Sequence, residues 1–385
     1  MSLKLKMQRA VLAFSLLGSL AGPVLCAPAS RDSFEAFERD VDTMMRGYVS
    51  KSGWAANLAI VYAGRKIVRG SYGIGDRVWQ IPTRPDAVYR VGSTTKMFTA
   101  VAILQLIQSG KLAIDASVRN YLPDSPQSWQ PITIQNLLSQ SSGLAEYSAS
   151  TNSFRALMRV DRTPDAILAL VKDQPLRFIP GSKFEYSNTN YVALGMIIEK
   201  VTGKTYADYI GEQVLRPAGM THSGYFDDTQ ILPSFVPGYL LTDGGLQNMF
   251  HISPNMLYAA GNLYSTIDDL ILWDRALHDT DALGLNATLR TRMFQDQGFG
   301  YGFGAFVDKI DGEIAVGHGG TLPGYQVGYE RFTRVPLTII LMANVYPVDV
   351  DKIAGDLARL FFKHCGKIDP ARQCDLTSLS FAVAQ

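Results

Sequence analysis

Hydrophobic residues form short blocks near both ends of the chain and longer blocks through its middle. Leu58-Ala59-Ile60-Val61-Tyr62 and Ile67-Val68-Arg69 lie on either side of Ala63-Gly64-Arg65-Lys66, a pattern typical of two strands joined by a tight turn. Asp311-Gly312 predicts another turn late in the chain. Around it, we expect four more strands, at 303–307, 313–316, 325–332 and 337–343.

Helical patterns dominate the middle of the chain. Residues 97–107 are apolar on nearly every side, which predicts a buried helix, and Ser109-Gly110 ends it. Residues 191–202 and 267–276 predict two more helices, and the second has two aspartates in its first turn. A last amphipathic helix fits residues 351–362.

Strands at both ends of the chain therefore bracket a mainly helical insert. We predict an α+β protein in which one antiparallel sheet is built from both chain termini, flanked by helices, with a helical lobe beside it. The sheet lobe is expected over about 30–92 and 290–365, and the helical lobe over about 93–289. A functional site is expected in the cleft between the two lobes.

The composition of the 385-residue chain limits the classes of partner. Lys and Arg total 36 against 35 Asp and Glu, which gives a formal net charge of +1. Without an excess of positive charge, binding of nucleic acid and polybasic docking on membranes are not expected. A hydrophobic fraction of 47% is typical of a globular protein and excludes a coiled coil or wholesale disorder.

Residues 1–29 have the pattern of an export signal. Lys4, Lys6 and Arg9 precede an apolar stretch over 10–21, and small residues follow at Ala27-Pro28-Ala29. The stretch is short for a bilayer span, although an uncleaved anchor or a buried core helix are alternatives. We therefore expect a protein exported to the periplasm or secreted, with no stable membrane span once the signal is removed.

Cysteine and histidine usage gives no sign of a metal site. Cys26 follows Pro23-Val24-Leu25, a poor context for lipid attachment. After removal of the signal, Cys365 and Cys374 remain and could close a small disulfide loop. Neither their spacing nor that of the five histidines matches a metal-ligand motif, so we expect no metal.

The first chemical signal is Val91-Gly92-Ser93-Thr94-Thr95-Lys96, at the start of the most hydrophobic helix. A Ser and a Lys three positions apart share one helix face, so Lys96 can reach Ser93. A desolvated lysine amine can take the proton of a serine hydroxyl, and a helix N-terminus favours an oxyanion. Roughly one such spacing is expected by chance, but this S-x-x-K stands alone in the sequence.

The second signal is Tyr186-Ser187-Asn188, shortly after the turn Pro180-Gly181-Ser182. A tyrosine beside a Ser–Lys pair can relay a proton, and an asparagine amide can orient both the lysine and a substrate carbonyl. Taken alone, the tripeptide fits a loop tyrosine followed by a helix cap. Together with Ser93 and Lys96, it favours a catalytic interpretation.

The third signal is Val316-Gly317-His318-Gly319-Gly320-Thr321, where an apolar strand ends in glycines. Glycine lets a substrate approach a strand edge, and the amide of the next residue can donate to an oxyanion. His318 could bind a substrate or pass protons; a turn with a solvated histidine is the alternative. His222 has the same H-x-G spacing but lies in a loop, and the other histidines lack such a setting: His251, His278 and His364.

In this order, the three motifs resemble the serine β-lactamase and penicillin-binding-protein family, in particular the branch of class C β-lactamases, D-aminopeptidases and family VIII esterases. The resemblance covers about residues 34–362, with supporting stretches at 132–144, 180–181 and 260–266. The roles that it implies are an acylated nucleophile at Ser93, its proton partner at Lys96 and a general acid or base at Tyr186. It also implies that Asn188 holds the substrate amide or Lys96, that the backbone amides of Ser93 and Thr321 form an oxyanion hole, and that His318 and Gly320 line the strand edge.

The resemblance implies a cycle without a cofactor: attack of Ser93 on a carbonyl, an acyl-enzyme, and release by water. The classical β-lactamase has Lys-Thr-Gly where this chain has His318-Gly319-Gly320. Losing a permanent cation weakens the grip on a substrate carboxylate, because histidine is mostly neutral at pH 7. We expect a small-molecule or peptide substrate with an ester, amide or D-amino-acid peptide bond. The alternatives are a true β-lactamase, a penicillin-acylated sensor without turnover, and a structural scaffold.

Overall fold

The structure is a computed structural model that describes residues 31–149, 154–310 and 312–365. The predicted signal over 1–29, with Cys26, lies outside the described residues, as do Asp311 of the predicted turn and Cys374 of the predicted disulfide. Among the helices of the described ranges, none is both long enough and apolar enough to cross a membrane.

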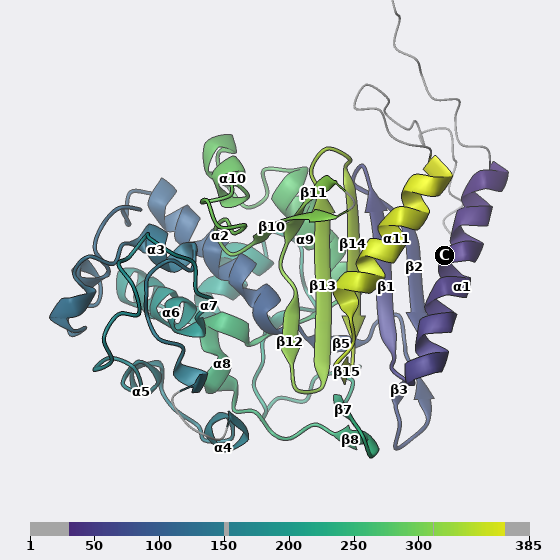
Figure 1. The fold of residues 1–385 in the computed structure, drawn as a ribbon, viewed down its shortest axis with the longest axis horizontal. Coiled ribbons are helices and arrows are strands. Elements are labelled where there is room, and N and C mark those ends of the chain that lie inside the picture. Colours follow the sequence, from purple (N-terminus) through teal and green to yellow (C-terminus); the bar gives the residue numbers. More distant parts are fainter. Residues whose placement is uncertain (1–30, 150–153, 311, 366–385) are drawn as a thin grey trace, which may run out of the picture.

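A seven-stranded antiparallel sheet forms the centre of the fold (Figure 1). Its strand order is β10-β11-β13-β14-β1-β2, and β12 pairs with β13 on the same edge as β11. Two strands come from the start of the chain and five from its end, which confirms the predicted antiparallel sheet built from both termini. The strands are β1 (Ala56–Tyr62), β2 (Arg65–Tyr72), β10 (Phe306–Ile310), β11 (Glu313–Gly317), β12 (Gly320–Leu322), β13 (Tyr325–Phe332) and β14 (Leu337–Ala343).

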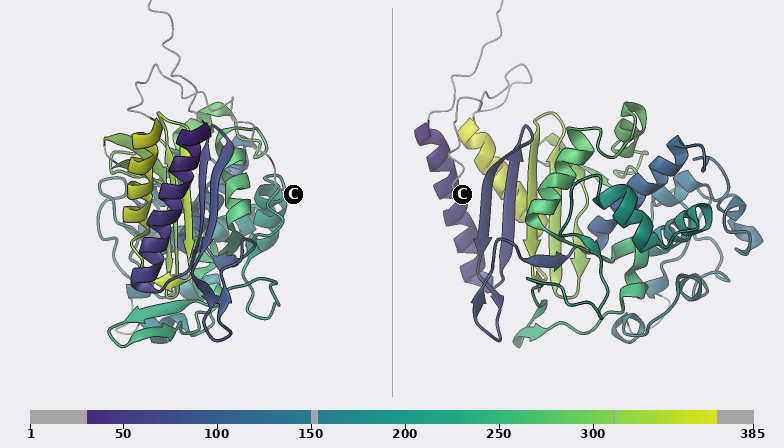
Figure 2. Two further views of the ribbon diagram at one scale, coloured as in Figure 1. Left: turned by 90° about the vertical axis from the view of Figure 1, so that its right-hand side faces the viewer. Right: turned by 180° about the vertical axis from the view of Figure 1, so that it is seen from behind.

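Helices cover both faces of this sheet. The first and last helices, α1 (Arg31–Ser52) and α11 (Val350–Cys365), lie side by side on one face (Figure 2). On the other face, α9 (Ile267–His278) packs against β1 and β14. Every residue of β1 and β14 is buried, as expected for central strands that are covered from two sides.

The remaining helices gather beside the sheet (Figure 1). They are α2 (Thr95–Gln108), α3 (Ile134–Leu138), α4 (Phe154–Met158), α5 (Pro164–Leu168), α6 (Asn188–Thr202), α7 (Tyr206–Ile210), α8 (Pro254–Gly261) and α10 (Ala287–Met293). Helix α2 packs against α6, α7 and α8, and eleven of its 14 residues are buried. This burial explains the apolar pattern of residues 97–107 and confirms the predicted helix.

Short strands occur where the sequence predicts mainly helix or no element. They form small sheets: β3 (Ile74–Asp76) with β4 (Ile81–Pro82); β5 (Val88–Arg90) and β6 (Gly224–Tyr225) on either side of β9 (Leu263–Thr266); and β7 (Tyr239–Thr242) with β8 (Gly245–Asn248) and β15 (Val345–Tyr346). Strands of two to four residues are too short to show a hydrophobic period. The strand expected from residue 303 begins at Phe306, since Gly304 has a φ of +74°.

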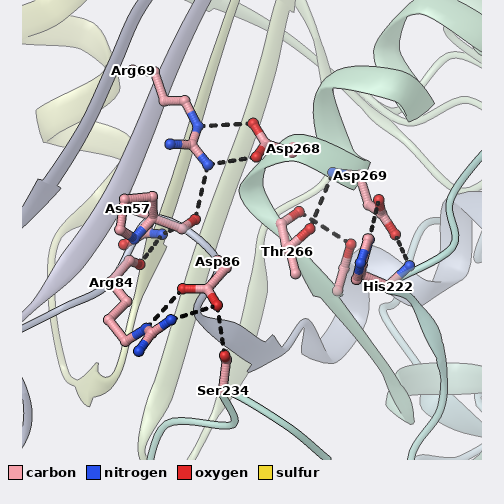
Figure 3. A network of polar contacts seen from close by, with 11 residues as sticks. Asn57, Arg69, Arg84, Asp86, His222, Ser234, Thr266, Asp268 and Asp269 are labelled. Carbon is pink, nitrogen blue, oxygen red and sulfur yellow. Dashed lines mark hydrogen bonds and ion pairs between the residues drawn. The ribbon is translucent and has the colours of Figure 1, made fainter. Parts of the chain in front are cut away.

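A polar network ties the start of α9 to the sheet and to the segment that leads into β5 (Figure 3). Arg69 on β2 donates to Asp268 over 2.8 Å and to the carbonyl of Pro85 over 3.1 Å. Nearby, Asp86 accepts a hydrogen bond of 2.7 Å from Ser234. Because β5 follows directly, these contacts fix the direction in which the chain enters the candidate site.

Candidate active site

A cavity of about 750 Å³ lies between the edge of the sheet and the helical lobe. Five of the seven predicted site residues line it: Ser93, Tyr186, Asn188, His318 and Thr321. Lys96 is fully buried behind Ser93, and Gly320 is buried in β12 beside Thr321. The structure therefore brings all seven predicted residues to one place, from three distant parts of the chain.

Ser93 lies in the 3-10 turn Gly92–Thr94 that runs directly into α2, and Lys96 is in the first turn of that helix. The Lys96 Nζ lies 3.0 Å from the Ser93 Oγ, 2.8 Å from the Asn188 Oδ1 and 2.7 Å from the carbonyl oxygen of Ala260. Burial lowers the pKa of Lys96 to about 7, and the charge of Glu146 opposes part of this shift. Near pH 7, a large share of Lys96 is therefore neutral.

The partners of Lys96 decide what the neutral amine can do. A neutral amine has two N–H groups and one lone pair, whereas the Asn188 Oδ1 and the Ala260 carbonyl can only accept hydrogen bonds. These two acceptors take both N–H groups and leave the lone pair toward the Ser93 hydroxyl. The geometry thus suits transfer of a proton from Ser93 to Lys96.

Glu146 fixes the orientation of Asn188. It accepts a hydrogen bond from the Asn188 backbone amide, and its Oε1 accepts one from the Asn188 Nδ2 over 3.3 Å. This second contact turns the Asn188 Oδ1 toward Lys96. Sequence reasoning missed Glu146, because a single glutamate in a loop carries no pattern; its position two residues after the stretch 132–144 is the only signal.

Tyr186 lies against the same lysine. The Lys96 Nζ is 4.8 Å from the centre of the Tyr186 ring. Burial raises the pKa of the Tyr186 hydroxyl above its ordinary value, and a hydrogen bond to Ser93 offsets only part of that rise. Tyr186 therefore keeps its proton at neutral pH. It can relay a proton, but it does not act as a phenolate base.

Strand β12 passes unusually close to the turn that holds Ser93. A Cβ atom on Gly320 would lie 1.8 Å from the carbonyl oxygen of Val91, so only glycine fits there. Gly92 has a φ of +53°, and a Cβ on it would lie 3.0 Å from the Thr321 backbone nitrogen. This approach brings the Thr321 amide beside the Ser93 turn, where an oxyanion hole needs a second donor.

His318 is enclosed by aromatic rings and is only 2% exposed. The ring centres of Phe306, Tyr301 and Tyr186 lie 5.0, 5.9 and 6.0 Å from that of His318. Its Nδ1 lies 2.5 Å from the carbonyl oxygen of Gly319, so Nδ1 carries a proton. Burial and the charge of Lys96 lower the pKa of His318 to about 3. The ring is thus neutral, and its buried Nε2 is an acceptor without a partner in the described structure.

His222, the other histidine with H-x-G spacing, is not among the residues that line this cavity. The side chain of His222 is 74% exposed, and its Nδ1 lies 3.8 Å from Asp269 in the network at the start of α9 (Figure 3). Among the described histidines, His318 alone lines the cavity that contains Ser93. Of the two histidines with H-x-G spacing, His318 is thus the one that lies beside Ser93.

The sheet, the helical lobe and the site between them define a protein of the β-lactamase and transpeptidase type. The family model for Beta-lactamase matches residues 41–361, and the chain belongs to this family.

Individual relatives carry different names. The chain is 26% identical over 330 residues to Penicillin-binding protein 4* of Bacillus subtilis strain 168, which covers 80% of this chain and 71% of that protein. It is 33% identical over 193 residues to Protein flp of Staphylococcus aureus strain COL, but this match covers 49% of this chain and only 38% of flp. Among solved structures, D-amino acid amidase from Ochrobactrum anthropi SV3 with D-phenylalanine aligns at a TM-score of 0.77 and 22% identity, over 85% of this chain and 99% of that one. This last match shows the shared fold.

Proposed function

We propose that this protein is a serine hydrolase that forms an acyl-enzyme on Ser93 and cleaves an ester, an amide or a D-amino-acid peptide bond. The observation that carries the proposal is the 3.0 Å contact between the Ser93 Oγ and the buried Lys96 amine, at the wall of a substrate-sized cavity. Relatives that are named as penicillin-binding proteins or as a D-amino acid amidase support the same class.

The first half of the proposed cycle acylates the enzyme. The Ser93 Oγ attacks the substrate carbonyl carbon while Lys96 takes the hydroxyl proton. The carbonyl oxygen becomes an oxyanion held by the backbone amides of Ser93 and Thr321. The bond to the leaving group then breaks, and the proton held by Lys96 passes through Tyr186 to the departing oxygen or nitrogen.

The second half releases the acyl group. A water molecule attacks the ester carbonyl of acylated Ser93 and gives its proton to the Tyr186 and Lys96 pair. The tetrahedral intermediate collapses, the acid leaves, and the proton returns to the Ser93 Oγ. Because burial keeps Tyr186 protonated and Lys96 partly neutral, Lys96 is assigned as the base and Tyr186 as the relay.

We propose that penicillins are poorer substrates than esters, amides or D-amino-acid peptides. A penicillin carries a carboxylate, which needs a cation near the strand edge. His318 stands at that edge and is neutral; among the described residues that line the cavity, the cation is Lys309, which belongs to β10 and not to the strand edge at β12. We also keep the proposal that the protein is exported, which rests on the pattern of residues 1–29; the mass of the mature protein from its native host tests it.

Three chromogenic substrates test the proposed function: a β-lactam, a short-chain nitrophenyl ester and a D-amino-acid anilide. We expect steady turnover of the ester or the anilide, slow or absent turnover of the β-lactam, and loss of all turnover in Ser93→Ala. A burst of one product per protein without turnover on every substrate would instead identify a sensor. Turnover retained in Ser93→Ala would overturn the assignment of the nucleophile.

A further inference from the structure

Tyr186 lies in a stretch of chain that forms neither helix nor strand. Residues 183–187 connect the turn at Gly181-Ser182 to the start of α6. Such a stretch takes its shape from the groups that bind its backbone, because it lacks the regular hydrogen bonds of a helix or a sheet. The contacts on either side of Tyr186 therefore decide where its hydroxyl lies relative to Ser93.

Both neighbours of Tyr186 donate their backbone amides to one residue, Gln140. The Glu185 amide donates to the backbone carbonyl of Gln140 over 3.0 Å, and the Ser187 amide donates to the Gln140 Oε1 over 3.0 Å. Gln140 thus holds the chain directly before and directly after Tyr186. It is fully buried and is not among the described residues that line the cavity, so it acts on Tyr186 through the backbone and does not touch a substrate.

A series of side-chain hydrogen bonds fixes the orientation of the Gln140 amide. The Asn190 Nδ2 donates to the Gln140 Oε1, and the Asn190 Oδ1 accepts a hydrogen bond from the Ser142 Oγ. The Ser142 Oγ in turn accepts from the Leu144 amide over 3.0 Å. All four residues are buried, where hydrogen bonds of this kind are strong. The Gln140 Oε1 is therefore kept in the position from which it binds the Ser187 amide.

The backbone of Gln140 gives a second and independent indication. Helix α3 ends at Leu138, Ser139 is its C-cap, and Gln140 follows with a φ of +58°. Glycine is the usual residue at this position, because the left-handed conformation crowds a Cβ atom. A glutamine here lowers the stability of the fold, and costs of this kind are typical of functional sites. The need for a side-chain acceptor that glycine lacks explains why the position holds a glutamine.

We infer that Gln140 is a positioning residue for Tyr186 and thereby sets how well the protein protonates the leaving group. The inference rests on the proposed function, in which Tyr186 passes a proton from Lys96 to the departing oxygen or nitrogen. Attack by Ser93 and uptake of its proton by Lys96 do not involve Gln140. Loss of the Gln140 amide should therefore slow the reaction of substrates whose leaving group needs a proton.

Two esters with the same acyl group isolate this step. The 4-nitrophenyl and ethyl esters of butyric acid form the same acyl-enzyme, and kcat/KM compares the steps that lead to it. At pH 8, 4-nitrophenolate leaves without a proton, whereas the ethyl ester releases ethanol, whose oxygen takes its proton from Tyr186. In Gln140→Met, which keeps the length of the side chain and removes the amide, we expect the ratio of kcat/KM for the nitrophenyl ester to that for the ethyl ester to rise at least about tenfold.

Three further variants locate the effect. Gln140→Asn suits the left-handed backbone but is too short to reach the Ser187 amide, so it should raise the ratio as well, even if Gln140→Met does not fold. Gln140→Glu keeps an acceptor oxygen and should stay within about threefold of the wild-type ratio. Gln80→Met is the matched control: Gln80 also has a positive φ, of +54°, but it is exposed and does not line the cavity.

The results separate this inference from the proposed function. An unchanged ratio in Gln140→Asn, or an equal rise in Gln140→Glu or Gln80→Met, would overturn the role of Gln140 while the protein still hydrolyses both esters. Turnover of the esters by Ser93→Ala, or no acylation of the wild-type protein by either ester, would instead refute the proposed function, and the inference with it.

Discussion

The Ser93 Oγ and the Lys96 Nζ lie 3.0 Å apart, with the lysine held from behind by two acceptors. Because both acceptors can take N–H groups of a neutral amine, the direction of the contact depends on the protonation of Lys96. Protonated Lys96 donates to Ser93, whereas neutral Lys96 accepts from it. The activity of the site should therefore follow the charge of this one lysine.

The first prediction concerns pH. Burial lowers the pKa of Lys96 to about 7, so the neutral base is abundant above that pH and scarce below it. We expect the rate of Ser93 acylation by a neutral ester to fall about tenfold for each pH unit below about 7 and to level off above it. His318 adds no step in this range, because its pKa is about 3. A rate that falls as the pH rises through 7 would contradict the role of Lys96 as base.

The second prediction concerns Glu146. Its negative charge raises the pKa of Lys96, so Glu146→Gln should lower that pKa and move the acid limb of the pH profile to lower pH. The rate at high pH should also drop, because Asn188 loses an acceptor that orients it. Glu212→Gln, at an exposed ion pair with Lys204, is the control and should leave the profile in place. If the acid limb of the pH profile stays in place in Glu146→Gln, the charge of Glu146 does not set the pKa of Lys96.

The third prediction concerns the close approach of β12. A Cβ on residue 320 would collide with the Val91 carbonyl oxygen at 1.8 Å, so Gly320→Ala should displace β12 from the Ser93 turn. We expect a loss of about 1–3 kcal/mol in the free energy of unfolding, together with loss of acylation.

Thermal unfolding and labelling of Ser93 measure both effects. Gly47→Ala, in the middle of α1 with open space around the new Cβ, should instead stabilise the protein by up to about 1 kcal/mol. Unchanged stability and labelling in Gly320→Ala would show that the backbone contact is not required.

The fourth prediction concerns His318. His318→Phe keeps a ring among Tyr186, Tyr301 and Phe306 but removes the Nε2 acceptor. We expect a folded protein whose kcat/KM falls about tenfold for a substrate with N–H donors, and much less for a simple ester without them. Equal losses on both substrates would indicate a general disturbance of the site instead of a lost hydrogen bond.

Much of the fold follows from the sequence because its main elements have strong local patterns. Strands β13 and β14 lie at the predicted residues 325–332 and 337–343, since apolar blocks with clear turns leave little choice of boundary. The small sheet of β5, β6 and β9 could not be predicted, because its pairings join residues that are far apart and too few to show a period.

The site residues also fall into two groups: those that a sequence motif predicts and those that only the structure reveals. Ser93, Lys96, Tyr186 and His318 stand in short motifs with characteristic spacing, and the structure brings them together. Glu146 and the three acidic residues that line the cavity have no such motif. Asp308, Glu330 and Asp351 come from two strands and a helix, and they line one cavity because these elements pack together. Long-range packing of this kind leaves no local signal in one sequence.

The most direct measurement is the identity of the side chain that becomes covalently modified. The protein would be treated with a fluorophosphonate, digested, and mapped by mass spectrometry, with Lys96→Met alongside as the variant without a base. We predict one adduct, on Ser93, formed at least about a hundredfold more slowly in the variant. An adduct on a different residue, or equal rates in the two proteins, would contradict it.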